Sequence, residues 1–315
     1  MPGIAVSKCV LVVGATAGIG RALALAIWAL PSKPTVIVAG RRKERLEELV
    51  KKGLDDGDGR IKALQVDLTA ARDSLKAFTE HTLREYPDVR KACLIFVFVR
   101  SHTYMHSQLD SVVFSAGIQH ITDFSKPEEI DLDGKQPPPD SLLFFFPYNV
   151  SSSYPDFTSE VNINYIAIVT LITFFLPHFL KLSTEGRPTF IIPISSMLAI
   201  VPSGTLSDYC AMKAALHSLS LSLHSNLAST NVHIMEILPP LVESELHDNQ
   251  GTSEALSKIW MPLDTYTKYA MEGLLRGDVN IVTPNHEWLW EKFEKDKIGE
   301  TPMSLHRKHS SYSSV

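Results

Sequence analysis

The sequence predicts the α/β fold class, and its first forty residues carry the main observations behind that prediction. Cys9–Val13 is a short apolar run rich in β-branched side chains, which is typical of a buried strand. A helical pattern follows over residues 21–30 and ends before Pro31. Residues 35–39 then form a second apolar run, so a strand, a helix and another strand are expected in succession.

The turn between the first strand and the first helix is rich in glycine, with Gly14, Gly18 and Gly20. At such a junction, the backbone N–H groups of a helix N-terminus are placed to bind a pyrophosphate. Glycine is needed because a Cβ would block the close approach of the phosphates. From the glycines alone, a dinucleotide site and an ordinary tight turn both remain open.

The end of the second strand favours NADP(H) as the dinucleotide. In nicotinamide sites of this kind, an acidic residue at this position binds the ribose 2′-OH. The chain instead has Gly40, Arg41 and Arg42. Gly40 leaves space, and the guanidinium of Arg41 suits a 2′-phosphate. We interpret Arg42 as a solvated cation at the start of the next helix.

Ser196, Tyr209 and Lys213 form the candidate catalytic group. Tyr209 and Lys213 are four residues apart, so they share one face of a helix. A free tyrosine has a pKa of about 10, and a nearby ammonium is expected to lower that pKa towards neutrality. Ser196 follows an apolar run and is suited to polarise a substrate oxygen. The alternative is a surface Tyr–Lys pair on an amphipathic helix.

From about residue 8 to about residue 284, these motifs resemble the short-chain dehydrogenase/reductase family. The glycine turn is similar to the family's Thr-Gly-x-x-x-Gly-x-Gly motif, with Val13 in place of the usual Thr. Ser196, Tyr209 and Lys213 match its catalytic positions, and Asn164 matches its catalytic Asn. The resemblance implies that Asn164 holds a water that links Lys213 to solvent.

The resemblance also implies the remainder of a cofactor site. Asp67 matches an acid that contacts adenine, and Ser115 stands where the family usually has Asn. Ser244 stands where a Thr often bonds the carboxamide of the cofactor. The expected cofactor-binding residues are Gly14, Thr16, Gly18, Ile19, Gly20, Arg41, Asp67, Ser115, Ala116, Gly117, Tyr209, Lys213, Pro239, Val242 and Ser244.

For the whole chain, the resemblance implies one doubly wound Rossmann domain over residues 1–297, with helices on both faces of a central parallel sheet. It also implies a homodimer or homotetramer built on two long helices near residues 160–183 and 208–229. Residues 298–315 are rich in Ser, His, Lys and Arg, which predicts a disordered tail.

Composition argues against several other functions. The formal net charge of −5 is unfavourable for binding a nucleic-acid backbone. The cysteines, Cys9, Cys93 and Cys210, have no disulfide or metal-ligand spacing, and the histidines form no metal motif, so we expect no metal site. No secretory signal opens the chain, and we expect a cytoplasmic protein. Residues 165–180 are apolar but too short to span a membrane, so we expect a buried interface helix.

Two segments, residues 89–108 and 134–156, do not fit a βαβ chain. Neither has helical or alternating periodicity, and removing either one leaves a normal lead into the next element. One interpretation is that both are translated, unspliced introns of a fungal gene. The other is that they are genuine insertions, such as a substrate lid or an interaction loop.

The sequence therefore predicts an NADP(H)-dependent oxidoreductase that interconverts a ketone or aldehyde and an alcohol, with Tyr209 as the acid/base. The alternative is a catalytically silent NADP-binding protein, either regulatory or a product of mis-splicing. Residues 241–263 are expected to cover a small-molecule substrate. Leu246, Trp260 and Met261 in that segment fit an apolar pocket wall and core packing equally well.

Overall fold

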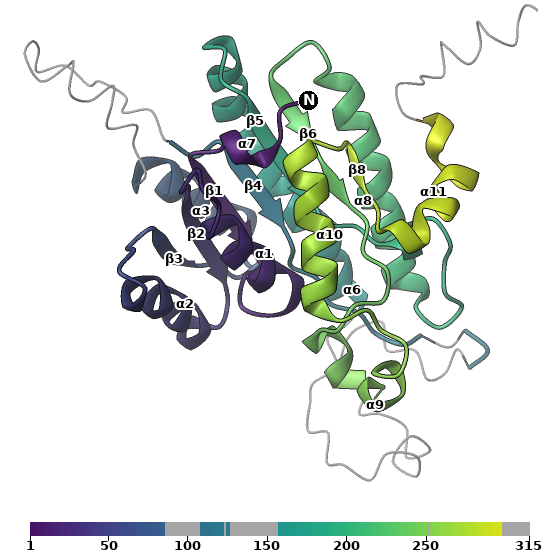
Figure 1. Ribbon diagram of the computed structural model, residues 1–315. Coiled ribbons are helices and arrows are strands. Elements are labelled where there is room, and N and C mark those ends of the chain that lie inside the picture. Colours follow the sequence, from purple (N-terminus) through teal and green to yellow (C-terminus); the bar gives the residue numbers. More distant parts are fainter. Residues whose placement is uncertain (86–107, 123, 127–156, 251, 298–315) are drawn as a thin grey trace, which may run out of the picture.

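The computed structural model describes residues 1–85, 108–122, 124–126, 157–250 and 252–297. A six-stranded parallel sheet forms its centre, with the strand order β3-β2-β1-β4-β5-β6 (Figure 1). This order confirms the predicted doubly wound Rossmann fold. The strands are β1 (Cys9–Val13), β2 (Thr35–Gly40), β3 (Ile61–Gln65), β4 (Ser111–Phe114), β5 (Thr189–Pro193) and β6 (Val232–Ile234).

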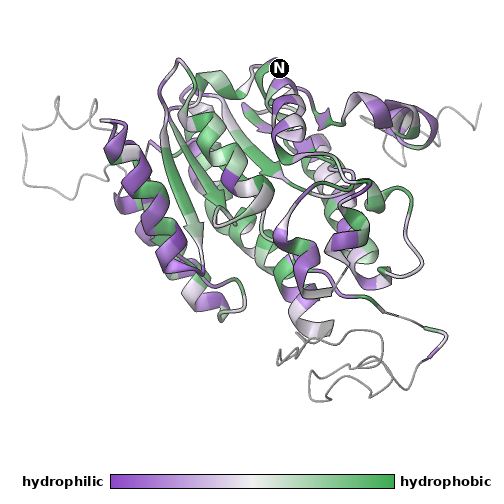
Figure 2. Ribbon diagram, turned by 60° about the horizontal axis from the view of Figure 1, so that its bottom comes forward, coloured by the Kyte–Doolittle hydropathy of each residue, from purple (hydrophilic) through white to green (hydrophobic). Residues whose placement is uncertain are grey.

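The burial of β1 explains why helices cover both faces of the sheet. Val10 and Val12 pack into one core cluster, whereas Leu11 and Val13 pack into another, because successive strand residues point to opposite faces. Figure 2 shows hydrophobic strands at the centre and hydrophilic outer faces on the helices. The helices are α1 (Gly18–Trp28), α2 (Lys43–Asp55), α3 (Arg72–Glu85), α6 (Phe157–Val161), α7 (Ala167–Thr184), α8 (Ser207–Asn226), α9 (Ser253–Leu256), α10 (Leu263–Arg276) and α11 (Glu287–Phe293).

The two core clusters assign each major helix to a face. One cluster joins β1 and β2 to α1, α2 and α10, and α1 packs directly on α10. The other cluster joins the sheet to α3, α7 and α8, and α3 packs on α7. Short 3-10 helices, labelled η, complete the fold: η1 (Ile4–Val6), η4 (Met197–Ala199), η5 (Glu245–Gln250), η6 (Pro284–His286) and η7 (Lys295–Lys297).

The helix that carries Asn164 is long and apolar. It runs through α6, a π-helical turn η3 (Asn162–Ile166) and α7. The expectation that this segment is too short to span a membrane was wrong, because Thr158–Thr184 forms one helix that by length and composition alone could cross a membrane, with a mean hydropathy of 1.8. Its buried residues, which include Leu171, Phe175 and Phe179, pack into the core cluster beside the sheet. Core packing therefore accounts for the apolar face of this helix.

Residues 232–238 form two short strands rather than one. β6 pairs with β5, but after Met235 the chain forms β7 (Glu236–Ile237), which pairs in parallel with β8 (Asn280–Ile281). The run is apolar apart from His233 and Glu236, and its pattern does not reveal that the second half leaves the central sheet. The break carries Glu236 to a place beneath α8, where it contacts His217.

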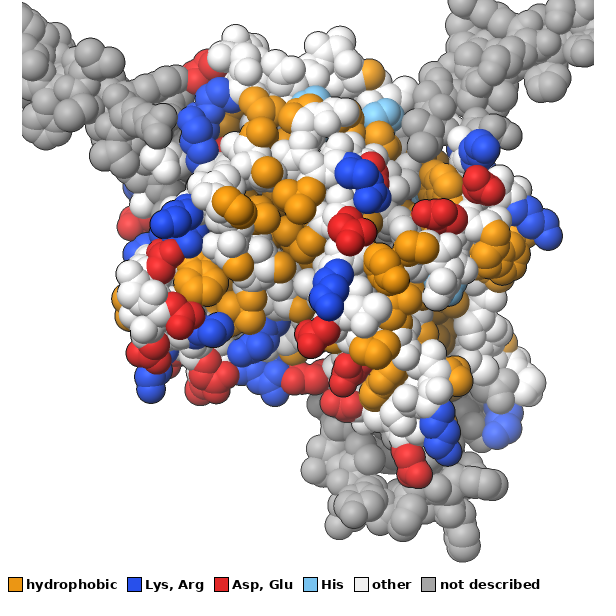
Figure 3. All heavy atoms as spheres, in the orientation of Figure 1, with side chains coloured by type: hydrophobic (Ala, Val, Ile, Leu, Met, Phe, Trp, Pro, Cys, Tyr) orange, Lys and Arg blue, Asp and Glu red, His pale blue; other side chains and the backbone are white. Residues whose placement is uncertain are grey.

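The surface seen in the orientation of Figure 1 mixes charged and apolar groups. Figure 3 shows acidic and basic side chains interspersed over this face, with apolar side chains between them. The predicted segments 89–108 and 134–156 lie outside the described residues, apart from Gln108, and so does the predicted tail, 298–315.

Candidate active site

A cavity of about 910 Å³ lies at the carboxyl edge of the sheet. Such an edge is where open α/β sheets bind their ligands. The expected site residues that line the cavity are Gly14, Thr16, Gly18, Ile19, Arg41, Asp67, Ser115, Ala116, Gly117, Ser196, Tyr209, Lys213, Pro239, Val242 and Ser244. Gly20 and Asn164 do not line it, and their contacts show what they do instead.

The glycine turn is closely packed and leaves a helix N-terminus open. Gly14 has a φ of 90°, and a Cβ there would lie 2.4 Å from the amide nitrogen of Ala116. A Cβ on Gly20 would lie 2.4 Å from the carbonyl oxygen of Gly14, so Gly20 allows α1 to pack against the turn. The N-cap of α1 makes no side-chain capping bond. Its first N–H groups are therefore suited to receive a phosphate.

Three arginines gather where β2 ends. Arg41 is exposed and lines the cavity. The Nε and Nη2 atoms of Arg42 donate to Thr16 Oγ1 at 3.1 and 2.9 Å, and its Nη1 pairs with Glu245 at 2.7 Å. Arg45 pairs with the same Glu245 carboxylate. Arg42 is exposed at the N-cap of α2, as expected for a solvated cation at a helix start, but Glu245 also reaches it from a segment far along the chain.

Asp67 lies at the end of β3 and faces the same cavity. Its Oδ1 accepts hydrogen bonds from the backbone N–H of Thr69 at 2.9 Å and from the Thr69 hydroxyl at 2.8 Å. Partial burial raises the pKa of Asp67, but these hydrogen bonds and the charge of Arg41 outweigh it, so the pKa is lowered. The carboxylate is thus available as an acceptor for a ligand amine or hydroxyl.

Ser196, Tyr209 and Lys213 converge in the cavity from two elements. Tyr209 and Lys213 lie on the first two turns of α8, and the Nζ of Lys213 lies 5.4 Å from the centroid of the Tyr209 ring. The same Nζ donates to the carbonyl oxygen of Ile194 at 2.8 Å. Ser196 precedes η4, and its Oγ accepts from the backbone N–H of Leu198 at 3.1 Å. The Ser196 Oγ also donates to the carbonyl oxygen of Pro239 at 3.4 Å.

Burial has the largest effect on the pKa values of Tyr209 and Lys213. It raises the pKa of Tyr209 well above its ordinary value, the charges of Glu160 and Cys210 add to the rise, and the hydrogen bond from Ser196 opposes it. Burial also lowers the pKa of Lys213 to about 8, against the fields of Glu236 and Glu160. The expected lowering of the Tyr209 pKa by the Lys213 ammonium is not observed, because burial raises that pKa instead. The sequence pattern gives the spacing of the two groups but not the cost of burying them.

Asn164 fixes the chain where it leaves β4. Its Oδ1 accepts from the backbone N–H of Ile118 at 2.9 Å, and its Nδ2 donates to the carbonyl of Ile118 at 2.7 Å. A Cβ on Gly117 would lie 3.2 Å from Asn164 Oδ1 and 3.7 Å from Lys213 Nζ. Asn164 is fully buried in the π-helical turn η3. Both ends of its amide hold backbone, so the contacts give it a positioning role beside Lys213.

The structure also shows polar pairs that the sequence analysis missed. His120 contacts Glu160 at 2.7 Å, and Gln119 contacts His247 at 3.0 Å. His120, Gln119 and His247 all line the cavity. One signal was available in advance: Glu160 precedes Asn164 by one helical turn and so shares its helix face. No local pattern connects His247, which lies in η5, to Gln119.

The expected covering segment lies over the cavity, but only part of it lines the wall. Leu246 lines the cavity, whereas Trp260 and Met261 do not. Met261 instead packs against the core cluster and forms a β-bridge with Val242. For Met261, the structure therefore supports core packing over the apolar pocket wall.

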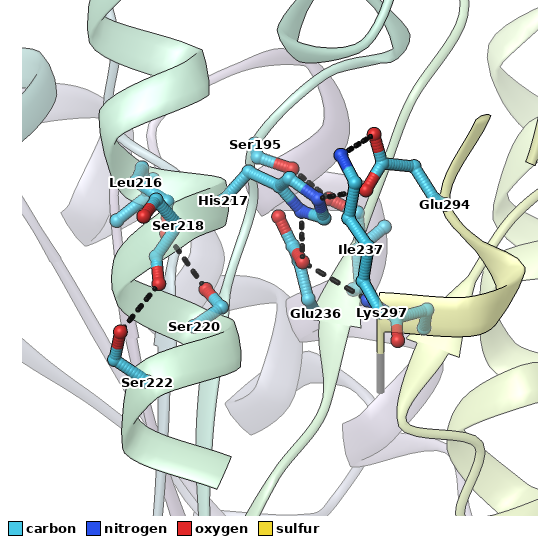
Figure 4. Close-up of polar contacts among 11 residues, drawn as sticks. Ser195, Leu216, His217, Ser218, Ser220, Ser222, Glu236, Ile237, Glu294 and Lys297 are labelled. Atoms are coloured by element: carbon cyan, nitrogen blue, oxygen red, sulfur yellow. Dashed lines mark hydrogen bonds and ion pairs between the residues drawn. The ribbon is translucent and has the colours of Figure 1, made fainter. Parts of the chain in front are cut away.

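A buried polar cluster anchors α8 behind the catalytic group. His217 lies one turn after Lys213, and Figure 4 shows its ring between Glu236 and Glu294. Its Nδ1 contacts Glu236 at 2.8 Å and its Nε2 contacts Glu294 at 3.1 Å. Burial lowers the pKa of His217, but the hydrogen bonds and charges of both glutamates outweigh it and raise the pKa. Lys297 closes the cluster with a contact of 2.7 Å to Glu294.

Comparison with known proteins agrees with this geometry. A family model described as short chain dehydrogenase matches residues 8–95 and 149–255, and the chain belongs to this family of oxidoreductases. The uncharacterized oxidoreductase DltE of Bacillus subtilis (strain 168) is 30% identical over 291 residues, which cover 92% of this chain and 93% of DltE. Dehydrogenase/reductase SDR family member 7 of Mus musculus is 25% identical over 259 residues, covering 81% of this chain and 61% of that protein.

Solved structures share the fold. A short-chain dehydrogenase from Sphingobium yanoikuyae in complex with NADPH has a TM-score of 0.65 at 21% identity, covering 89% of this chain and 91% of that one. A short chain dehydrogenase/reductase from Burkholderia phymatum in complex with NAD has a TM-score of 0.63 at 15% identity, covering 90% and 91%. Because the two neighbours bind different nicotinamide dinucleotides, fold likeness does not choose between NADP(H) and NAD(H).

Proposed function

We propose that this protein is an NADP(H)-dependent oxidoreductase that interconverts a ketone or aldehyde and an alcohol. The observation that carries the proposal is the convergence of Ser196, Tyr209 and Lys213 on a cavity that also contains the open N-terminus of α1. A proton donor and a dinucleotide site in one cavity are the two parts that a carbonyl reduction needs.

Different residues of the cavity bind the cofactor, hydrogen-bond the substrate and transfer the proton. The glycine turn and α1 bind the pyrophosphate, and Ser196 donates a hydrogen bond to the substrate oxygen. When bound, the nicotinamide supplies or accepts the hydride at the carbonyl carbon. Tyr209 gives its proton to that oxygen during reduction and takes it back during alcohol oxidation. Lys213, with its pKa lowered to about 8, lies beside the phenol to stabilise the phenolate that remains.

The arginines after β2 support NADP(H) as the cofactor. No carboxylate stands at the end of β2, so the usual partner of a ribose 2′-OH is missing there. Arg41, Arg42 and Arg45 instead form a cationic end of the site. A 2′-phosphate is a bidentate acceptor that suits guanidinium groups. Glu245 already pairs with two of these arginines, so a phosphate arriving there would compete with it.

Replacing Tyr209 tests the proposed reaction directly. Tyr209→Phe removes the proton donor and keeps the ring, so NADPH oxidation with ketones and aldehydes should fall by at least about 100-fold. The Kd for NADPH, measured by its fluorescence, should remain within about twofold because the phosphate site is untouched.

Two results would contradict the proposal. Substantial residual activity in Tyr209→Phe would remove the phenol from the acid role. Binding of NADPH by the wild type without turnover of any carbonyl in the panel would instead support a catalytically silent NADP-binding protein.

A further inference from the structure

His120 and Glu160 form a polar pair inside the substrate end of the cavity. His120 lies in the loop after β4 and lines the cavity, while Glu160 lies on α6 and is buried, with 1% of its surface exposed. The His120 Nδ1 and the Glu160 Oε2 are 2.7 Å apart. None of the reaction steps assigned to Ser196, Tyr209 and Lys213 uses this pair.

Burying Glu160 is costly, and packing does not explain it. Moving a carboxylate out of water is unfavourable unless hydrogen bonds satisfy its oxygens. The other oxygen of Glu160, Oε1, has no hydrogen-bond partner within the described residues. The charge of Glu160 also raises the pKa of Tyr209, which makes the phenolate harder to form. A carboxylate that is expensive to bury and opposes phenolate formation is best explained by its effect on His120.

The loop that carries His120 is fixed on both sides. Asn164 binds the backbone of Ile118 on one side, and the Thr122 hydroxyl donates to Asp208 at 3.1 Å on the other. The imidazole between these anchors is held by Glu160. A ring positioned in this way is prepared for a defined hydrogen bond before a ligand arrives.

The chemistry of imidazole then identifies the ligand group. A carboxylate at Nδ1 accepts the proton of that nitrogen, which leaves Nε2 for another partner. A neutral ring offers a lone pair at Nε2 to a hydroxyl, and a protonated ring offers N–H to an oxygen. A hydroxyl group satisfies either form, because it both donates and accepts, whereas an alkyl group would leave Nε2 unpaired.

We propose that His120, oriented by Glu160, binds a hydroxyl group of the substrate, so that the protein prefers hydroxy-ketones, hydroxy-aldehydes or the corresponding diols. This inference rests on the proposed oxidoreductase function and names its substrate class. His120 is the binding residue and Glu160 is a positioning residue. The neighbouring Gln119–His247 pair makes the same region of the cavity polar.

Matched ketones test the role of His120. The kcat/KM values for NADPH oxidation are measured with acetoin against butanone, and with α-hydroxyacetophenone against acetophenone. The hydroxyl group itself activates the carbonyl, so the diagnostic quantity is how the ratio within each pair changes between variants. In His120→Leu the ratio should fall about 10- to 100-fold, because the hydroxyl loses its partner. His120→Gln, which retains a polar amide, should lie between Leu and wild type.

The control is His81→Leu, an exposed histidine of α3 that does not line the cavity. Its ratios should equal those of the wild type. If His120→Leu no longer binds NADPH, the test relies on His120→Gln instead. A kcat/KM ratio in His120→Gln equal to that of the wild type then overturns the proposal. Unchanged ratios in His120→Leu overturn it as well. If the wild type reduces none of the four ketones, the proposed function falls together with this inference; turnover with no dependence on His120 defeats only the inference.

A second variant tests the role of Glu160. Tyr209 is faced by Glu160 from α6, by Lys213 and Cys210 on its own helix, and by Ser196. Glu160→Gln retains an acceptor for His120 but removes the charge that raises the pKa of Tyr209. The pH profile of kcat should therefore move to lower pH, and the hydroxyl ratio should fall less than in His120→Leu. The pH profile reports the effect of the Glu160 charge on Tyr209, whereas the hydroxyl ratio reports the orientation of His120, so a ratio in Glu160→Gln equal to that of the wild type would end the positioning role.

Discussion

At the scale of single residues, the two adjacent arginines after β2 differ in what their side chains contact. Arg42 is held by the Thr16 hydroxyl and by Glu245, so its guanidinium is already engaged. Among the described residues, the Arg41 side chain donates no hydrogen bond, while its carbonyl oxygen accepts from Gln65 Nε2 at 3.0 Å. Arg41 also faces the cavity and acts on Asp67 through its charge. It is therefore the arginine of the two that is more available to a ligand phosphate.

This difference predicts the effect of reversing the charge at Arg41. Arg41→Asp should raise the Kd for NADPH about tenfold or more, because a charge-assisted hydrogen bond is lost and an anion faces the phosphate. The Kd for NADH should change much less. Lys43→Asp is the matched control, since Lys43 is exposed and does not line the cavity. Fluorescence titration of both cofactors measures the effect, and equal weakening of the two would contradict NADP(H) preference.

At the scale of elements, the segment from β7 to α9 covers both ends of the cavity. Its Glu245 pairs with Arg42 and Arg45 at the cofactor end, and its His247 contacts Gln119 at 3.0 Å at the substrate end. A Cβ on Gly18 would lie 3.2 Å from the Cβ of Ser244, so the segment lies directly against the glycine turn. A bound cofactor and a bound substrate are therefore both expected to contact the segment from β7 to α9.

Removing the negative charge of Glu245 should strengthen binding of the phosphorylated cofactor. In Glu245→Gln, a 2′-phosphate no longer competes with a carboxylate for Arg42. The pair is partly exposed and is worth at most about 1 kcal/mol, so the Kd for NADPH should fall about two- to fivefold. The Kd for NADH should stay constant, as should both values in the control Glu254→Gln on α9. Weaker NADPH binding in Glu245→Gln would instead show that the carboxylate helps to hold the cofactor.

These contacts also show why the sequence revealed the elements but not all of the site. Strand and helix patterns depend on neighbours within a few residues, which made β1, α1 and the pairing of Tyr209 with Lys213 predictable. The contact between Arg42 and Glu245 joins residues 203 positions apart, and no local periodicity encodes it. Burial is equally non-local. The sequence placed Lys213 beside Tyr209 but did not show that desolvation dominates both pKa values.

At the scale of the whole molecule, the last described turns are tied to the helix that carries the catalytic residues. Glu294 follows α11 and contacts His217 on α8, and Trp290 packs edge-on against the His217 ring at 6.1 Å between centroids. Glu236 contacts the other side of the ring and accepts from Asn280 at 3.0 Å. A single buried imidazole thus joins α8, β7 and the C-terminal turns, as Figure 4 shows.

This junction makes the stability of the protein depend on pH. The pKa of His217 is raised above its ordinary value of about 6.5, so the stabilisation is fully present below that value and is lost as the pH rises through the folded-state pKa. Glu294→Gln should therefore lower the melting temperature by several degrees near pH 6, and the difference from wild type should shrink as the pH rises. Thermal melts of both proteins, recorded from near pH 6 upwards, measure this difference in melting temperature. The difference in melting temperature between wild type and variant cancels the contribution of other groups that titrate in the same pH range. Asp110 is one such group, because burial raises its pKa to about 6.

The matched control is Glu291→Gln, which removes an exposed carboxylate from the same helix, where Glu291 pairs only loosely with Lys295 at 4.0 Å. Its melting temperature should follow that of the wild type at every pH, because an exposed pair at this distance contributes little. A difference between wild type and Glu294→Gln that stays constant with pH would show that the contact acts as a neutral hydrogen bond. In that case His217 would join the C-terminal turns to α8 without carrying a charge.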